Sequence, residues 1–326
     1  MRWIVFLARK LARLIVLLAA VSVIAFTLVS LSPIDPIDAY IGADMLSIGL
    51  EQRAQIAARW GLDQPAPVRF LNWLEQLAQG NLGFSRVYNQ PVSQAIGYRF
   101  ATSLALMGVA WTVSGLLGFM LGVVAGAAEG SWFDQAIRLY AYTLASTPLF
   151  WMGLLLLTVF AVWLKMAPFC CAAPVGMLPE DVTLWQRLQH LALPAATLSI
   201  IGIANMALHT RQKMLDVMHS DYVLMARAMG ESPWGVIRQH ALRNVALPAV
   251  TLQFASLGEL FGGAVLAEQV FSYPGLGQAT ILAGLQGDVP LLLGIVLFST
   301  VFVFSGNTLA DLIYQIVDPR IRLAEG

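Results

Sequence analysis

The stretch Ser220–Pro248, SDYVLMARAMGESPWGVIRQHALRNVALP, is a polar, positively charged segment between two long apolar segments. Gly230 suits a helix end, where a left-handed conformation is needed. Ser232 and Pro233 form a helix-start signal, a side-chain cap followed by a residue that tolerates the first turn. The stretch therefore predicts two short helices that meet at Gly230. A segment this long and this structured is expected to dock onto another surface.

Apolar side chains in and around this stretch recur at steps of three and four residues, which places them on one face of a helix. The first stripe consists of Met214, Met218, Tyr222, Met225 and Met229, and the second of Trp234, Ile237, Ala241 and Val245. Polar faces are supplied by Arg227, Arg238, His240 and Arg243.

The composition is that of an integral membrane protein. Of the 326 residues, 58% are hydrophobic and only 12% are charged, far from the averages of soluble domains. The formal net charge is zero, so bulk charge gives no indication of nucleic-acid binding.

Six apolar stretches are predicted to span the membrane, each close to the length of about 20 residues that a bilayer requires. They are roughly Leu11–Leu31, Ala101–Ala127, Leu139–Leu164, His190–Leu208, Ala249–Phe271 and Leu291–Ile316. Basic residues stay on the cytoplasmic side, and several precede and enter the first span, so the N-terminus is placed inside. Most of the nineteen basic residues then fall in inside segments, which predicts that both termini are cytoplasmic.

These spans divide the chain into four parts. Residues 1–31 hold the N-terminal tail and first span, 32–97 an outside segment, 98–316 a five-helix core with a cytoplasmic loop at 211–248, and 317–326 a cytoplasmic tail. The outside segment is expected to contain helices at Ser47–Trp60 and Val68–Leu77. A further short helix is expected at Ala279–Leu285.

Two features of the spans predict how they pack. Gly118, Gly122 and Gly126 recur every four residues in the second span and would let a neighbouring helix approach closely, although glycine is also common in membrane helices. Pro148 can kink the third span.

Two carboxylates lie in the fifth span, where a charge is costly and marks a candidate functional site. Glu268 lies near the predicted outer end, where solvent would lower that cost. Glu259 is deeper and should face the protein interior, a partner or a water-filled pathway. Helix pairing and a role in translocation both remain open for Glu259.

Motifs for catalysis and metal binding are absent from the sequence. No glycine is followed by lysine, and neither HExxH nor CxxC occurs, so no phosphate-binding loop, metal site or catalytic residue is predicted. Cys170 and Cys171 are adjacent, and successive α-carbons lie closer than disulfides prefer. We therefore expect them to be non-structural thiols.

Several motifs, in order along nearly the whole chain, resemble one family. ARAMG at 226–230, HALRN at 240–244 and Pro248 resemble the cytoplasmic EAA loop of ABC importer membrane subunits, in the form found in the peptide/nickel permease family (dipeptide and oligopeptide permease B-type subunits). Leu224 stands where the general loop pattern has glutamate. The other matching blocks are the basic N-terminus with the first span, Ser32–Pro36, Gly61–Pro65, Phe70–Leu74, Gly80–Ser85, Glu268–Phe271 and Pro274–Gly277 with Asp288 and Pro290, and the ending with Asp311, Tyr314, Asp318–Arg320 and Arg322.

The resemblance implies an all-α, six-helix type I ABC importer permease (MetI-like) fold in the bacterial inner membrane, with an extra-cytoplasmic insertion after the first helix. It implies four kinds of partner: a second, usually different permease, two ATPase subunits that use ATP-Mg, an external substrate-binding protein and the lipid bilayer. This chain would bind no cofactor and would not be an enzyme. The residues implied in ATPase coupling are Tyr222, Ala226, Arg227, Ala228, Gly230, Trp234 and Arg238, and those assigned to the translocation pathway are Glu259 and Glu268.

The substrate within such a family stays open. A di- or oligopeptide is favoured, and nickel or a metal–chelator complex taken up by the same mechanism is the alternative. A secondary transporter would show inverted repeats and several deep ionisable groups. An intramembrane hydrolase would need a nucleophile and a base at membrane depth. The sequence offers neither set of features.

Overall fold

The computed structural model describes residues 2–31, 49, 51, 55, 64–178 and 180–317. It is mostly helical and separates into two compact units, Met1–Thr102 with Gly275–Phe304 and Ser103–Pro274 with Ser305–Gly326. The predicted helix at Ser47–Trp60 and most of the C-terminal tail lie outside the described residues. The four-part division along the sequence stays a prediction.

The first unit contains two short strands among its helices. Its elements are α1 (Arg2–Ser30), α4 (Ala66–Ala78), β1 (Phe84–Ser85), β2 (Gln90–Pro91) and α13 (Leu276–Leu285), with the beginnings of α5 (Val92–Ala127) and α14 (Val289–Val317). The strands pair antiparallel. The helices predicted at Val68–Leu77 and Ala279–Leu285 are confirmed as α4 and α13.

A buried carboxylate joins two parts of this unit that lie 203 residues apart in the chain. Asp288 is fully buried and accepts hydrogen bonds from Ser85 Oγ at 2.7 Å and from the Val87 backbone N–H at 3.0 Å. It also accepts from the Leu291 N–H at 3.2 Å, in the first turn of α14. Because each contact satisfies part of the carboxylate, Asp288 fixes the hairpin to the start of α14.

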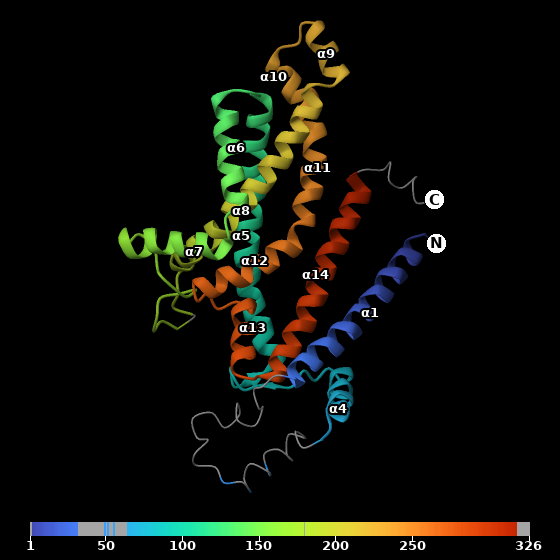
Figure 1. Ribbon diagram of the computed structural model, residues 1–326, viewed down its shortest axis with the longest axis vertical. Coiled ribbons are helices and arrows are strands. Elements are labelled where there is room, and N and C mark those ends of the chain that lie inside the picture. The colour runs from blue at the N-terminus through green and yellow to red at the C-terminus, as the bar shows by residue number, and fades with distance from the viewer. Residues whose placement is uncertain are drawn as a thin grey trace. The chain divides into compact units, whose positions relative to one another are not determined.

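The second unit is a helical bundle. It contains α6 (Trp132–Ala145), α7 (Leu149–Leu156), the π-helical segment η2 (Leu157–Trp163), α8 (Leu184–Met218), α9 (Asp221–Ala228), α10 (Pro233–Val236), the π-helical segment η3 (Ile237–Ala241), α11 (Leu242–Ala255) and α12 (Leu257–Val270), with most of α5. Within this unit α8 leads into α9 and α10, and the chain returns through α11 (Figure 1).

The glycines of α5 pack directly on α8, which confirms the predicted close approach. A Cβ atom at Gly118 would lie 2.6 Å from Met206 Cβ, and one at Gly122 would lie 2.5 Å from Thr210 Cβ. The series continues with Gly126 against Met214 at 2.5 Å. Because partner numbers rise together in steps of four, the two helices run parallel. Any side chain larger than hydrogen at these positions would force them apart.

Two of the six predicted spans are bent rather than straight. Four described helices are long and apolar enough to cross a membrane, and there are six spans if each bent pair counts as one. Helices α6 and α7–η2 meet at 107°. This angle confirms the predicted kink and shows that the third span is sharply broken. The break lies just before Pro148, because proline disfavours the helical conformation at the residue that precedes it.

The second bend, of 50°, separates α11 from α12 at Ser256. The Ser256 hydroxyl donates to the Gln253 carbonyl at 2.9 Å, a local bond that competes with the helical ladder. The predicted fourth span is part of α8, which reaches 35 residues and begins with Thr183 and Gln186 capping each other.

We expect Gly122→Ala to lower stability, because the new methyl group would lie 2.5 Å from Thr210 Cβ and 2.7 Å from the Ala207 carbonyl oxygen. Overpacking of this kind costs about 1–3 kcal/mol. The thermal unfolding midpoint of the purified protein in detergent measures the effect. Gly108→Ala on the same helix is the control, because nothing lies within 4 Å of its added methyl group. Equal losses in both variants would contradict the packing.

Candidate functional site

The loop that follows α8 has the backbone predicted from its sequence. Helix α9 ends before Gly230, which has a φ of +85°, and α10 begins after Ser232. The Ser232 hydroxyl accepts the Gly235 N–H at 3.1 Å, and Pro233 occupies the first turn. The two-helix prediction is therefore confirmed.

The apolar side chains of this loop divide into an inner and an outer set. The inner set forms a buried cluster made of Met214, Met218, Val223, Ala226, Val236, Ala241 and Val245. The chain turns between α8 and α9, so the first predicted stripe splits: its two α8 methionines are buried and its α9 members are exposed. Ala226 is only 2% exposed, so its side chain holds α9 against this cluster rather than facing outward.

The outer set is an exposed apolar surface, called here the loop surface. It consists of Tyr222, Leu224, Met225, Met229 and Trp234. Trp234 is 68% exposed and Met229 is 74% exposed, so Trp234 is not part of the buried stripe that Ala241 and Val245 continue. Arg227 and Arg238 are also exposed. Large apolar side chains that a folded loop leaves uncovered indicate a contact with another protein.

Polar contacts fix the shape of the loop. Asn244 Nδ2 donates to the Tyr222 hydroxyl at 3.2 Å, which ties α9 to α11. The His240 Nε2 atom lies 2.9 Å from Glu231 Oε2. Because both contacts bridge the two sides of the turn, the loop surface is presented by a braced segment.

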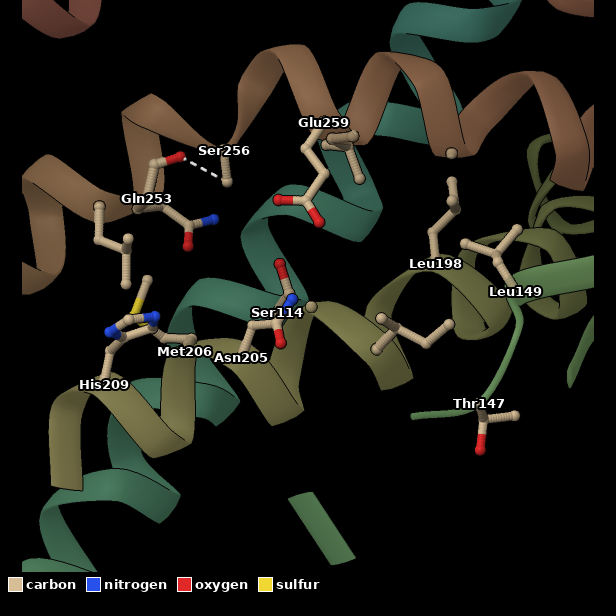
Figure 2. A pocket seen from close by; sticks show the side chains of 15 residues that line it. Ser114, Thr147, Leu149, Leu198, Asn205, Met206, His209, Gln253, Ser256 and Glu259 are labelled. Carbon is tan, nitrogen blue, oxygen red and sulfur yellow. Dashed lines mark hydrogen bonds between the residues drawn. The ribbon is translucent and has the colours of Figure 1, made fainter. Parts of the chain in front are cut away.

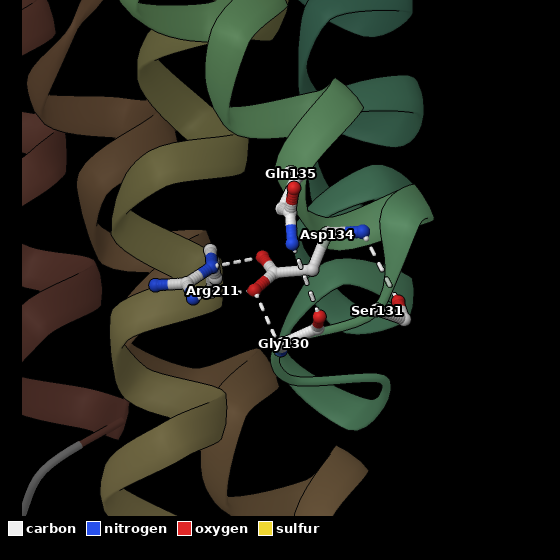
Figure 3. A network of polar contacts seen from close by, with 5 residues as sticks. All are labelled: Gly130, Ser131, Asp134, Gln135 and Arg211. Carbon is white, nitrogen blue, oxygen red and sulfur yellow. Dashed lines mark hydrogen bonds and ion pairs between the residues drawn. The ribbon is translucent and has the colours of Figure 1, made fainter.

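A buried ion pair holds the end of α8 from which the loop projects. Arg211 donates from Nη2 to Asp134 at 2.8 Å and from Nε to the second carboxylate oxygen (Figure 3). The same carboxylate accepts the Gly130 N–H at 3.0 Å. Asp134 is 1% exposed and Arg211 13%. The pair therefore joins the turn between α5 and α6 to α8 with two parallel hydrogen bonds.

A cavity of about 470 Å³ lies between α5, α8, α11 and α12. Its polar lining residues are Ser114, Thr147, Asn205, His209, Gln253, Ser256 and Glu259. The Glu259 carboxylate points from α12 across the space toward the side of α8 that carries Asn205 (Figure 2). A smaller cavity of about 210 Å³ shares His209 and Leu252 with it and extends to Lys213. Together the two cavities lie along one face of α8 and extend toward the end of α8 that leads into the loop.

The second carboxylate of this span lies elsewhere. Glu268 is 1% exposed and accepts a hydrogen bond from Ser103 Oγ at 2.5 Å. The expectation that solvent lowers its cost is wrong, because α5 covers it and a hydroxyl satisfies it instead. The structure does not bring Glu268 to the cavity beside Glu259.

The prediction for the cysteines is also wrong. Cys170 and Cys171 form a disulfide, with their α-carbons 3.8 Å apart. The prediction rested on the spacing of the α-carbons, and the disulfide forms at that spacing, with Cys171 in a left-handed conformation at a φ of +73°. The Cys171 N–H donates to the Phe271 carbonyl at 3.0 Å, so this loop is attached to the end of α12.

Sequence reasoning missed the polar residues that act in pairs. Asp134, Arg211 and Asn205 are not among the residues that the sequence singles out. Each becomes recognisable only when the partner helix is known. The spacing of Asn205 and His209, four residues apart at the end of the predicted fourth span and just after it, is the signal that could have found the cavity, because it places both on one face of a helix.

Two family descriptions match almost the whole chain. Residues 118–323 match "Binding-protein-dependent transport system inner membrane component", and residues 3–109 match the N-terminal part of such membrane components. The oligopeptide transport system permease protein AppB of Bacillus subtilis (strain 168) is 32% identical over 97% of this chain and 98% of its own length. The di/tripeptide transport system permease protein DppB of Pseudomonas aeruginosa (strain UCBPP-PA14) is 34% identical with the same coverage.

Solved structures share the fold at low sequence identity. The MetNI methionine ABC transporter, in inward-facing conformations, aligns with a TM-score of 0.54 at 17% identity, over 69% of this chain and 97% of that chain. An amino acid ABC transporter crystallised with histidines aligns with a TM-score of 0.52 at 15% identity, over 68% and 94%. At these identities the likeness supports the MetI-like fold and no further property.

We expect Asp134→Asn to destabilise the protein by about 3–5 kcal/mol, because it leaves the buried Arg211 guanidinium without its counter-charge. Unfolding in a graded denaturant series measures the loss. Lys213→Gln is the control, since Lys213 and Asp216 form an exposed pair, 55% and 49% accessible, that should contribute less than about 1 kcal/mol. A loss no larger than that of the control would show that the Asp134–Arg211 pair does not hold α8.

Proposed function

The chain belongs to the family of binding-protein-dependent transport system inner membrane components, and from this premise we propose that it carries di- or oligopeptides across the bacterial inner membrane. It is a multi-pass permease subunit of an ABC importer. The peptide assignment is supported by the relatives from Bacillus subtilis and Pseudomonas aeruginosa, whose names specify oligopeptides and di- or tripeptides. Nickel or a metal chelate handled by the same mechanism is the alternative.

The loop surface is the observation that carries the mechanism. It lies on a braced turn at the end of α8, and it combines exposed aromatic and methionine side chains with Arg227 and Arg238. This surface docks onto an ATPase subunit, where the apolar side chains bury area and the arginines meet acidic groups. Tyr222, Ala228, Gly230 and Trp234 lie at the contact, and Ala226 supports it from inside.

The assembly follows from this contact. The chain pairs with a second, different permease, and each permease docks on one ATPase subunit. ATP-Mg binds in the ATPase subunits, and this chain catalyses no reaction. An external binding protein delivers the peptide to the side of the membrane opposite the loop surface. Both termini lie on the cytoplasmic side with the loop surface.

The two cavities that share His209 form part of the translocation pathway. They lie along one face of α8, from the part that faces Glu259 of α12 to Lys213, near the end of α8 that leads into the loop. The parallel, close-packed α5–α8 pair forms one wall of this pathway. Movement of the docked ATPase is transmitted to the α5–α8 pair through the Asp134–Arg211 ion pair and the buried cluster under α9.

The chain and its sister permease are expected to transport nothing without the ATPase subunits. Proteoliposomes that contain the two permeases, the binding protein and internal ATP should accumulate labelled peptide only when the ATPase subunits are present. The reason is that this subunit supplies a pathway and a docking surface but no energy source. Concentrative uptake by the permeases alone would contradict the proposed function.

Substitutions on the loop surface should uncouple ATP hydrolysis from transport while leaving membrane insertion intact. Met229→Asp places a charge on an apolar side chain that is 74% exposed, so peptide uptake per ATP hydrolysed should fall by about tenfold. Met229→Leu, which keeps the surface apolar, is the control.

Gly230→Arg should also lower peptide uptake per ATP hydrolysed, because a bulky residue replaces a left-handed glycine at the contact. Gly230→Asn is the control, since asparagine tolerates that conformation better. Normal coupling in both Met229→Asp and Gly230→Arg would exclude the loop surface as the ATPase contact.

A further inference from the structure

We propose that the cavity beside Glu259 is a subsite for a positively charged group of the substrate, of the class of the N-terminal ammonium of a peptide. This inference rests on the proposed function and names the part of the peptide that the permease itself recognises. It would give the membrane subunit a selectivity of its own, separate from that of the external binding protein.

The charges of the cavity favour a cation. Of its described lining residues, Glu259 is the one carboxylate, His209 is the other titratable group, and none is a lysine or an arginine. The volume of about 470 Å³ lies in the range of small-ligand sites. A peptide amine can therefore enter with room for its first side chain, whereas a free carboxylate would meet Glu259 with no counter-charge.

Glu259 is open to such a ligand. In the part of the chain that the structure describes, no hydrogen bond or ion pair is made by the side chains of Glu259, Asn205 or His209. A carboxylate within a membrane span is costly unless it meets a cation or water. The exposed side chain of Glu259 is directed into the cavity (Figure 2), so a cation that pairs with it would be bound there.

The bend between α11 and α12 places this carboxylate at a helix end beside the cavity. Glu259 lies in the first turn of α12, just after the break at Ser256. The positive end of the helix dipole favours a negative charge there without the use of a fixed basic residue. A broken helix within a span is tolerated where it lines a cavity. Glu259 therefore lines the cavity from a helix N-terminus, with no lysine or arginine among the described lining residues.

The α11 side of the cavity is already satisfied. Gln253 Nε2 donates to the Trp111 carbonyl at 2.6 Å, and Trp111 Nε1 donates back to the Gln253 carbonyl at 2.8 Å. These reciprocal bonds fix Gln253 against α5. Asn205 and His209, four residues apart on α8, keep hydrogen-bonding groups that the described residues do not use. These groups can form hydrogen bonds with the first peptide bond of the ligand.

The test uses the complex of this chain with its sister permease and ATPase subunits in nanodiscs, without the binding protein. Equilibrium binding of tritiated trialanine and of N-acetyl-trialanine is measured for the wild type and for Glu259→Gln. We expect Glu259→Gln to weaken trialanine binding about tenfold and to leave the acetylated peptide within about twofold, because only the free amine carries the charge that Glu259 pairs with. Glu75→Gln, which removes an exposed carboxylate of α4, should leave both unchanged.

Three results would overturn the inference. The first is equal binding of the two peptides by the wild type, or no saturable trialanine binding. The second is a loss in Glu259→Gln that is the same for both peptides. The third is release of the sister permease from Glu259→Gln on size-exclusion chromatography, which would make that subunit the partner of the carboxylate. ATP-driven uptake by the same wild-type complex with its binding protein separates the outcomes, because its absence contradicts the proposed function instead.

Discussion

Close contact between α5 and α8 is the constraint on which the second unit depends. Three glycines spaced by four residues let the two helices touch without intervening side chains, and this contact fixes their parallel direction. Lipid offers no hydrophobic drive to hold helices together, so such packing must supply the association. The Asp134–Arg211 pair then adds α6 to the same helix. The cavity and the loop surface both take their positions from α8.

The local parts of this arrangement were predictable from the sequence. Gly230, Ser232 and Pro233 specify a turn through their own backbone preferences, and the structure confirms it. The glycine spacing likewise predicted a close helix contact. These features succeed because each depends on residues only a few positions apart.

Features that depend on distant residues were not predictable. Proline alone fixes neither the angle nor the direction of the sharp bend at Pro148, where α6 and α7 both also pack on α8. Trp234 continues an apolar periodicity yet faces outward, because periodicity does not reveal which side of a helix the rest of the chain covers. Glu268 was expected near water, but its environment is set by Ser103, 165 residues away. Asp288 and Ser85, matched only as separate motifs, are one contact in the structure.

The glycine spacing also restricts how the unit can deform. A slip of α5 along α8 finds the next matching glycine only after four residues, about 6 Å of helix rise. Intermediate positions would place side chains against backbone, so gradual sliding is blocked and α5 and α8 move together as one rigid body. Changes of shape during a transport cycle must therefore be absorbed at the breaks before Pro148 and at Ser256. The second of these breaks lies between α11 and α12 and adjoins Glu259, so a change of angle at Ser256 would also move the carboxylate that lines the cavity.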